Sequence, residues 1–106
     1  MSTLIKEIDD DNFVATVEKG LTIVDFWAPW CGPCKALTPI LENAAKQHTQ
    51  VQFIKINVDE HKIIAGQYGI RGIPSLLLFK DGQHLETKIG LINLDDLTAL
   101  IESAST

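Results

Sequence analysis

The chain lacks three features that would point to a membrane, to secretion or to nucleic acid. No uninterrupted apolar run approaches the roughly 18 residues that suggest a membrane-spanning helix. The segment from Met1 to Glu7 has no basic region followed by an apolar stretch, so we expect no secretion signal. The formal net charge of −5 argues against nucleic acid as a partner. We therefore expect a cytoplasmic protein that binds neither a membrane nor nucleic acid.

Cysteine is equally scarce, since the only two, Cys31 and Cys34, stand three positions apart. A chain of 106 residues buries roughly 65% of its unfolded surface, so its core needs no disulfide staples. With 45% apolar and 22% charged residues, and with no repeat or linker, the sequence predicts one globular domain over residues 1–106. In a reducing compartment, such a cysteine pair is more often catalytic or metal-binding than structural.

The cysteines lie at a predicted strand-to-helix junction. The run Leu21–Trp27 is apolar on both faces except for Asp25, which is typical of a central strand covered by helices on each side. Apolar residues then recur at helical spacing up to about residue 48 or 49. Cys31 should therefore lie at the positive end of a helix, where unpaired backbone N–H groups stabilise a thiolate.

Residues three apart share one helix face, so Cys34 can approach Cys31 closely enough to close a small disulfide ring. Gly32 and Pro33 shape this ring. Pro33 suits the first helical turn, where no N–H donor is needed. The short spacing therefore favours reversible disulfide chemistry.

Zinc binding is the main alternative for the cysteine pair. Two cysteines make only half of a tetrahedral zinc site, and the usual histidine half needs two histidines three to five residues apart. The three histidines, His48, His61 and His84, are too widely separated for this. We expect them at the surface, and we expect neither a metal nor a bound cofactor.

The rest of the chain alternates strand and helix patterns. Further strands are predicted over Leu4–Ile8, Val51–Asn57, Ser75–Lys80 and Leu85–Ile89, the last two joined by a turn at Asp81-Gly82. A further short helix is predicted to follow caps at Asp9, Asp10 and Asp11, to carry Phe13, Val14 and Val17, and to end at Gly20. Others are predicted over Glu60–Tyr68 and, after a cap at Asn93 or Asp95, in the stretch that carries Leu94, Leu97, Leu100 and Ile101. The residues from Ser103 to Thr106 should fray. This order predicts an α/β fold with a central mixed five-stranded sheet flanked by four helices.

Asp25 is the anomaly of the central strand. Strand side chains alternate, so Ile23, Asp25 and Trp27 share a face, and the carboxylate falls in the core beneath the cysteine helix. Burying a carboxylate is costly unless it has a partner or a task. It is either a structural acid, hydrogen-bonded or paired with Lys55 on the next strand, or a proton acceptor with a raised pKa. The residue pattern leaves both open.

The segment Phe26–Lys35, which reads Phe-Trp-Ala-Pro-Trp-Cys-Gly-Pro-Cys-Lys, resembles the active site of the thioredoxin family. The resemblance continues through Tyr68–Ser75 and Phe79–Gly82 to Gly90, so it covers nearly the whole chain. It implies the thioredoxin fold, and it implies a protein disulfide reductase that is itself re-reduced by a thioredoxin reductase. It also implies that the Ile73-Pro74 bond is cis.

The resemblance assigns roles to the site residues. Cys31 is the implied nucleophile, and Cys34 resolves the mixed disulfide. Asp25 is the implied proton acceptor for Cys34, and Lys55 modulates it. Trp27 is expected to pack in the core, whereas Trp30 shields the sulfur or touches partners.

Members of the family bind disulfide-containing client proteins on an apolar patch around the exposed sulfur of the nucleophile. The matching positions here are Trp30, Gly32, Pro33, Ile73, Pro74, Ile89, Gly90 and Leu91. The backbone of Ile73 could pair with an extended client segment. Leu91 is bulkier than the small residue often found there, and Ser75 replaces a common threonine, so partner preference is the property most open to change.

Two other functions remain as alternatives. One is net disulfide oxidation or isomerisation, although the Gly32-Pro33 dipeptide resembles the reducing members. The other is a binding module in which the cysteines are incidental. We expect a monomer, with an electron donor that is either a flavoprotein using NADPH or an enzyme fed by ferredoxin.

Overall fold

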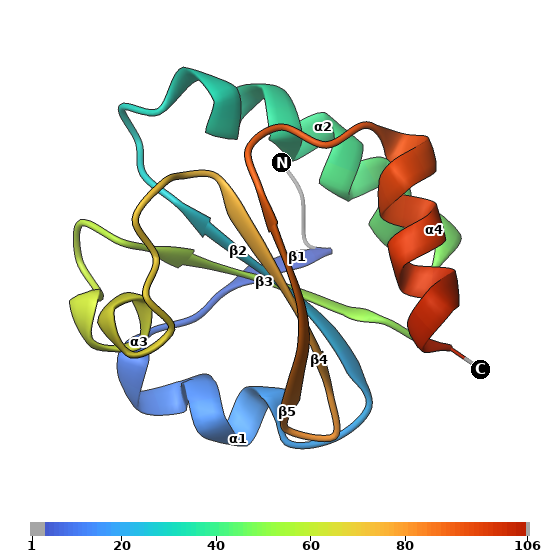
Figure 1. The fold of residues 1–106 in the computed structure, drawn as a ribbon, viewed down its shortest axis with the longest axis horizontal. Helices are drawn as coiled ribbons and strands as arrows, with labels where there is room; N and C mark the ends of the chain where they lie inside the picture. The colour runs from blue at the N-terminus through green and yellow to red at the C-terminus, as the bar shows by residue number, and fades with distance from the viewer. Residues whose placement is uncertain (1–3, 106) are drawn as a thin grey trace.

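Residues 4–105 are described by a computed structural model. The elements in chain order are β1 (Ile5–Glu7), the 3-10 turn η1 (Asp10–Asn12), α1 (Phe13–Val17), β2 (Leu21–Trp27), α2 (Gly32–Gln47), β3 (Gln52–Asn57), α3 (Lys62–Gln67), β4 (Ser75–Lys80), β5 (Gln83–Ile89) and α4 (Leu94–Ala104). Figure 1 shows one sheet with helices on both of its faces. The predicted thioredoxin fold, a mixed five-stranded sheet with four helices, is confirmed.

The sheet has the strand order β1-β3-β2-β4-β5. Strands β1, β2 and β3 are parallel, whereas β4 is antiparallel to β2 and β5 is antiparallel to β4. As predicted, β2 is the central strand. Parallel strands end on the same edge of a sheet, so the segments that follow β2 and β3 meet there. The cysteines follow β2 at this edge.

Alternation along β2 divides the core into two clusters. Ile23 packs with Leu37 of α2 and Leu97 of α4. Val24, on the opposite face, packs with Phe13 of α1 and Ile64 of α3. Helices α2 and α4 thus cover one face, and α1 and α3 cover the other (Figure 1). Both faces are buried, which explains why β2 is apolar along nearly its whole length.

The acidic run before α1 behaves differently from the prediction. Asp9 does cap η1, since its carboxylate accepts the N–H of Asn12 at 2.9 Å. Asp10 instead reaches α3, where its carboxylate accepts the N–H groups of Ile64 at 2.9 Å and Ile63 at 3.3 Å. The residue at the N-cap of α3, His61, makes no side-chain cap. A cap supplied from 53 residues away in sequence leaves no local signal.

Several predicted ends also need correction, among them those of α3, which runs over Lys62–Gln67 instead of Glu60–Tyr68. Strand β5 starts at Gln83 rather than Leu85, because the Asp81-Gly82 turn joins the strands directly and a register shift near Phe79 absorbs the extra residue. Helix α4 continues through Ser103 and Ala104 instead of fraying, and the Lys80 ammonium caps it by donating to the Ala104 carbonyl at 3.1 Å. Thr106 lies outside the described residues.

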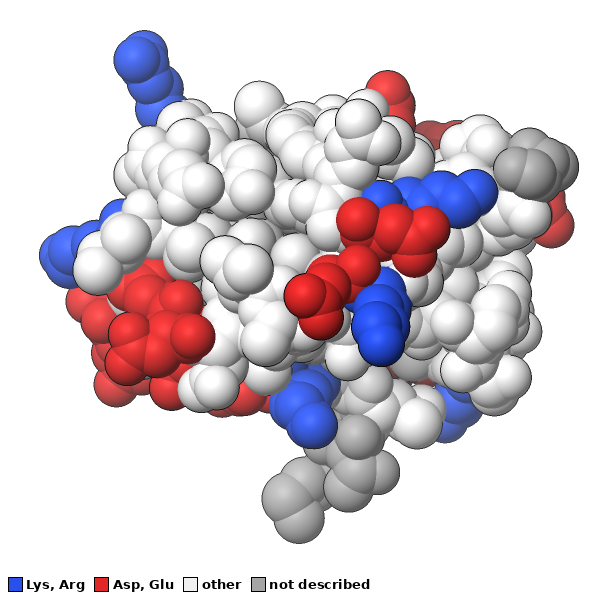
Figure 2. Space-filling view, turned by 90° about the horizontal axis from the view of Figure 1, so that it is seen from below, with Lys and Arg blue, Asp and Glu red and all other residues white. Residues whose placement is uncertain are grey.

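Figure 2, which views the molecule from the side that carries α1, shows its largest group of Asp and Glu side chains at one end, with further acidic and basic side chains interspersed across the rest. The acidic run Asp9–Asp11 contributes to the overall charge of −5. Among residues 4–105, no helix is long and apolar enough to cross a membrane.

Candidate active site

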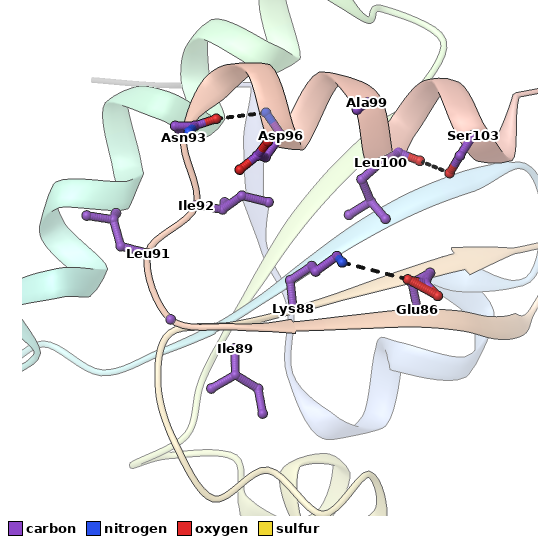
Figure 3. A pocket seen from close by; sticks show the side chains of 11 residues that line it. Glu86, Lys88, Ile89, Leu91, Ile92, Asn93, Asp96, Ala99, Leu100 and Ser103 are labelled. Atoms are coloured by element: carbon purple, nitrogen blue, oxygen red, sulfur yellow. Dashed lines mark hydrogen bonds and ion pairs between the residues drawn. The ribbon is translucent and has the colours of Figure 1, made fainter.

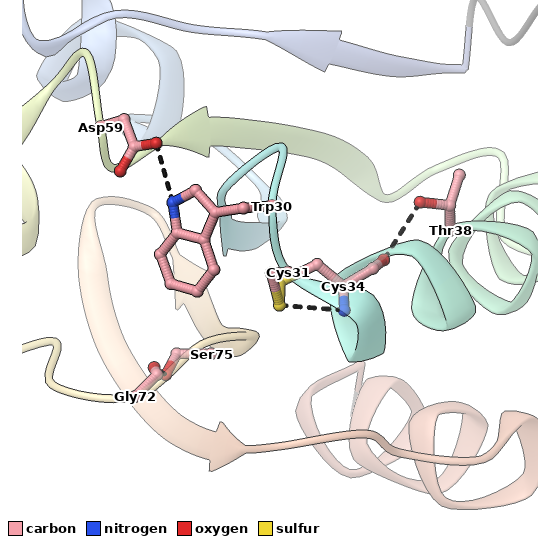
Figure 4. The surroundings of a disulfide bond; sticks show 7 residues. All are labelled: Trp30, Cys31, Cys34, Thr38, Asp59, Gly72 and Ser75. Carbon is pink, nitrogen blue, oxygen red and sulfur yellow. Dashed lines mark hydrogen bonds between the residues drawn. A yellow bond between two sulfur atoms is a disulfide. The ribbon is translucent and has the colours of Figure 1, made fainter.

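The two cysteines lie where β2 gives way to α2 (Figure 4). The turn between them and the strand is closed by a hydrogen bond from the Cys31 N–H to the Ala28 carbonyl at 3.1 Å. Cys31 is the N-cap of α2, and Cys34 lies in the first turn. Their Cα atoms are 5.3 Å apart, and the sulfurs form a disulfide. The predicted junction and ring are confirmed.

The start of α2 places partial positive charge at the Cys31 sulfur. The backbone N–H of Cys34 donates to Cys31 Sγ at 3.2 Å. Pro33 lies in the first turn, where its missing N–H removes no helical hydrogen bond. That turn carries no Asp or Glu to oppose a thiolate. In the reduced protein, these groups stabilise negative charge on Cys31.

Both cysteines are buried in the disulfide form, with Cys31 4% and Cys34 3% exposed. The prediction expected an exposed Cys31 sulfur, whereas the residue as a whole is buried in this state. The pair packs in a small cluster with Ala28, against the half-buried Trp27 and Ile73. The two cysteines are buried almost equally, so exposure does not indicate which sulfur is the nucleophile. Their positions relative to the helix N-terminus do differ, because Cys31 is the N-cap.

Asp25 is 4% exposed and belongs to the face of β2 that α2 covers. Its Oδ1 is buried and has no hydrogen-bond partner among residues 4–105. Burial raises the pKa of Asp25 from 3.8 to about 7, with Lys55 acting in the opposite direction. A carboxyl group with this pKa can take up and release a proton near neutral pH.

Lys55 is the direct neighbour of Asp25 in the parallel pairing of β2 and β3, as the sequence predicted. The two do not form an ion pair, since the one ion pair among residues 4–105 joins Lys88 and Glu86. The Lys55 ammonium lies instead over the Trp27 ring, 4.8 Å from its centroid. In the disulfide form, Asp25 therefore makes no ion pair within residues 4–105, contrary to the interpretation in which it is a structural acid paired with Lys55.

Trp30 is 69% exposed beside the disulfide (Figure 4). Its indole N–H donates to the Asp59 carboxylate at 2.9 Å. The sequence analysis did not single out Asp59. A signal for it existed, since Asp59 follows β3 as Trp30 follows β2, and these two strands are parallel. The Asp59 N–H is held in turn by the Asn57 side chain at 2.9 Å.

Two further predicted segments approach each other near the disulfide. The Ile73-Pro74 bond is cis, as predicted, and Ile73 packs against the cysteine cluster. The Gly90 N–H donates to the Pro74 carbonyl at 2.8 Å, and Gly90 adopts φ +91°. This turn carries the exposed side chains of Ile89 and Leu91. Pro74 itself is buried, so a partner would meet its loop rather than its ring.

The histidines only partly match their prediction. His84 is exposed and stacks on Phe79, with ring centroids 5.4 Å apart. His48 and His61 are half-buried. Among residues 4–105, no group of three or more His, Cys, Asp or Glu side chains is placed to hold a metal ion.

The disulfide closes a loop with a sequence separation of only 3. Because the stabilisation from a cross-link grows with the length of the loop it closes, this bond contributes little to folding. Its place at a helix N-terminus suits exchange of disulfides instead. The fold and the site together define a dithiol–disulfide redox protein.

Comparisons with known proteins support this class. The thioredoxin family profile matches residues 4–103. The thioredoxin of Chlamydia caviae is 42% identical over 102 residues, which cover 96% of this chain and 100% of that protein. The thioredoxin of Acidithiobacillus ferridurans is 45% identical, covering 97% and 98%. The solved structure of a thioredoxin variant from Halobacterium salinarum has a TM-score of 0.89 and 36% identity, covering 100% of this chain and 96% of that chain. The chain belongs to the thioredoxin family.

Proposed function

We propose that this protein is a protein disulfide reductase that passes two electrons from the Cys31 and Cys34 thiols to disulfides in client proteins. The carrying observation is the Cys31 sulfur at the start of α2, where it accepts the Cys34 N–H. This position favours the thiolate, which is the attacking species in thiol–disulfide exchange.

The reaction has two steps. The Cys31 thiolate attacks one sulfur of the client disulfide, which forms a mixed disulfide and releases the first client thiolate. Cys34 then loses its proton and attacks the Cys31 sulfur, which breaks the mixed disulfide and releases the second client thiolate. The client gains two electrons, and the protein ends with the Cys31–Cys34 disulfide.

Asp25 is the proposed proton acceptor for Cys34, and Lys55 the group that modulates it. Support comes from the pKa of Asp25, raised to about 7 by burial, and from its place on the face of the sheet that α2 covers. Lys55, its neighbour in the sheet, lowers that pKa and keeps part of the population ionised at neutral pH.

Clients are proposed to dock around Trp30, the Ile73-Pro74 loop and the turn at Gly90 and Leu91. Trp30 and Leu91 are 69% and 56% exposed, so together they offer partners apolar surface next to the cysteines. Gly32 and Pro33 are also exposed beside the disulfide. The backbone of Ile73 is proposed to pair with an extended client segment.

A thioredoxin reductase is the proposed electron donor, and a reducing compartment such as the cytoplasm the proposed location. We propose that the protein acts there as a monomer, as one domain. The use of its only two cysteines as an exchange pair supports the reducing compartment.

Reduction of insulin, followed by turbidity, tests the proposal. The wild type should catalyse reduction, and Cys31→Ser and Cys34→Ser should both be inactive in turnover. Cys34→Ser alone should accumulate mixed disulfides when client proteins from a lysate are added, because the first step survives. Activity in either single variant, or equal trapping by both, would contradict the assigned roles, and a wild type that reduces no insulin would favour the binding-module alternative.

A further inference from the structure

A groove of about 650 Å³ lies between the edge strand β5 and helix α4 (Figure 3). Ile92 and Leu100, only 8% and 7% exposed, provide apolar surface in it. Glu86 and Lys88 line it from the strand, and Asp96 lines it from the helix. Its volume falls within the range of roughly 300–1,000 Å³ that is common for ligand sites.

This groove is continuous with the proposed client surface. Ile89, Gly90 and Leu91 line the groove and also form the turn that faces the Ile73-Pro74 loop. Ile89 is 74% exposed and Leu91 is 56% exposed. A polypeptide that reaches the disulfide past Leu91 therefore meets the groove next.

Strand β5 offers this polypeptide a backbone to pair with. It is the last strand of the sheet and pairs only with β4, so its other edge has no strand partner within residues 4–105. An extended segment can add to such an edge through main-chain hydrogen bonds. The stretch from Glu86 to Ile89 spans about 10 Å, which suits three or four extended residues.

The charges of the groove favour a basic segment. Lys88 is paired with Glu86, their charged atoms 4.0 Å apart. Asp96 is exposed, and its carboxylate makes no hydrogen bond or ion pair among residues 4–105; only its backbone N–H is bonded, to Asn93 at 2.8 Å. Figure 3 shows the Asp96 side chain below α4, on the side of Ile92. One negative charge in the groove is thus free to meet a cation.

We propose that this groove binds the client residues next to the disulfide as a short extended segment beside β5. An apolar side chain of the segment covers Ile92 and Leu100, and a Lys or Arg side chain meets Asp96. This inference rests on the proposed function, because it extends the same client site.

The test compares a blocked groove with a matched control. Ala99 is exposed and lines the groove, so Ala99→Trp fills it, whereas Glu102→Trp places the same side chain on α4 outside the groove. The substrates are a small aromatic disulfide, a short disulfide peptide, and two longer peptides. One longer peptide has four added basic and apolar residues before the reactive cysteine, and the other has them after it.

Only one of the two extended peptides carries its added residues on the side of the cysteine that faces the groove. For that peptide, Ala99→Trp should raise KM roughly tenfold, to the value of the short peptide, with kcat unchanged. The short peptide and the aromatic disulfide should be unaffected, and Glu102→Trp should behave as the wild type. Asp96→Asn should remove the advantage of a Lys-containing extension over its Gln counterpart, which tests the groove with a variant that adds no bulk.

Several results would overturn the inference. Ala99→Trp could leave KM for both extended peptides unchanged, or raise it equally for the short and extended peptides. Sedimentation could also show a wild-type dimer that Ala99→Trp abolishes, which would make a second copy of the chain the occupant. If the wild type reduces none of the disulfides, the proposed function fails separately. Calorimetry of the extended peptides with a Cys31→Ser, Cys34→Ser double variant still tests the groove in that case, and no binding there would overturn the inference.

Discussion

Asp25 and Lys55 are neighbours across the paired strands β2 and β3, yet Lys55 lies over the Trp27 ring, 4.8 Å from its centroid, instead of pairing with the carboxylate. The Asp25 Oδ1 atom consequently has no hydrogen-bond partner within residues 4–105. A carboxyl group held in this way is costly to ionise, so the arrangement links the proposed proton transfer to the stability of the fold.

Replacement of Asp25 by Asn should stabilise the oxidised protein above pH 7. Below about pH 4 the carboxyl group is protonated in both the folded and the unfolded chain, so it carries no ionisation penalty. Between pH 4 and 7 the unfolded chain releases a proton that the folded protein keeps, because the folded pKa is about 7 against an ordinary 3.8. The free energy of unfolding therefore falls as pH rises, by an amount on the order of 4 kcal/mol.

Urea unfolding of the wild type and of Asp25→Asn at pH 4 and pH 8 measures this effect. The gain from the substitution should be large at pH 8 and small at pH 4. Asp95→Asn, at an exposed position on α4, is the control and should show little dependence of this kind. Equal midpoints for wild type and Asp25→Asn at pH 8 would remove the argument for a strained acid.

Alkylation of the reduced protein at mildly acidic pH should modify Cys31 before Cys34. The reason is the hydrogen bond from the Cys34 N–H to Cys31 Sγ and the place of Cys31 at the N-cap, both of which favour its thiolate. Mass spectrometry of digested samples taken over time gives the order. Faster labelling of Cys34 would exchange the roles of nucleophile and resolving cysteine.

Asp10→Ala should destabilise the protein by about 1–2 kcal/mol, because it removes the acceptor of the Ile63 and Ile64 N–H groups at the start of α3. Asp11→Ala is a suitable comparison, since Asp11 is exposed in the same turn. Urea midpoints of both variants at neutral pH give the difference. A similar loss in both would show that the charge of the acidic run, and not the cap, is responsible.

Gly90→Ala and Gly66→Ala should change stability in opposite directions. An added Cβ meets nothing within 4 Å at either position, so packing is not the cause. Gly90 has φ +91°, a conformation that costs an L-residue about 1–2 kcal/mol, whereas Gly66 lies within α3, where Ala is favoured by up to about 1 kcal/mol. Thermal unfolding of the two variants tests this. Stabilisation by Gly90→Ala would show that the turn relaxes without cost.

Much of the fold was predictable because its signals are local. The apolar run of β2, the helical spacing of α2 and the turn at Asp81-Gly82 each depend on neighbouring residues. The errors arose where a distant partner intervenes. Asp10 caps a helix far along the chain, and Lys80 caps the end of α4, so neither cap has a pattern that can be read along the sequence.

The same division holds for the site. The spacing of Cys31 and Cys34 and the alternation that buries Asp25 follow from backbone periodicity, so the sequence by itself determined the disulfide ring, the helix start and the face of the acid. Only the tertiary structure decided that Lys55 turns to Trp27, that Asp59 holds Trp30, and that the turn at Gly90 closes onto Pro74. These contacts depend on the order and direction of the strands, which bring distant segments together at one edge of the sheet.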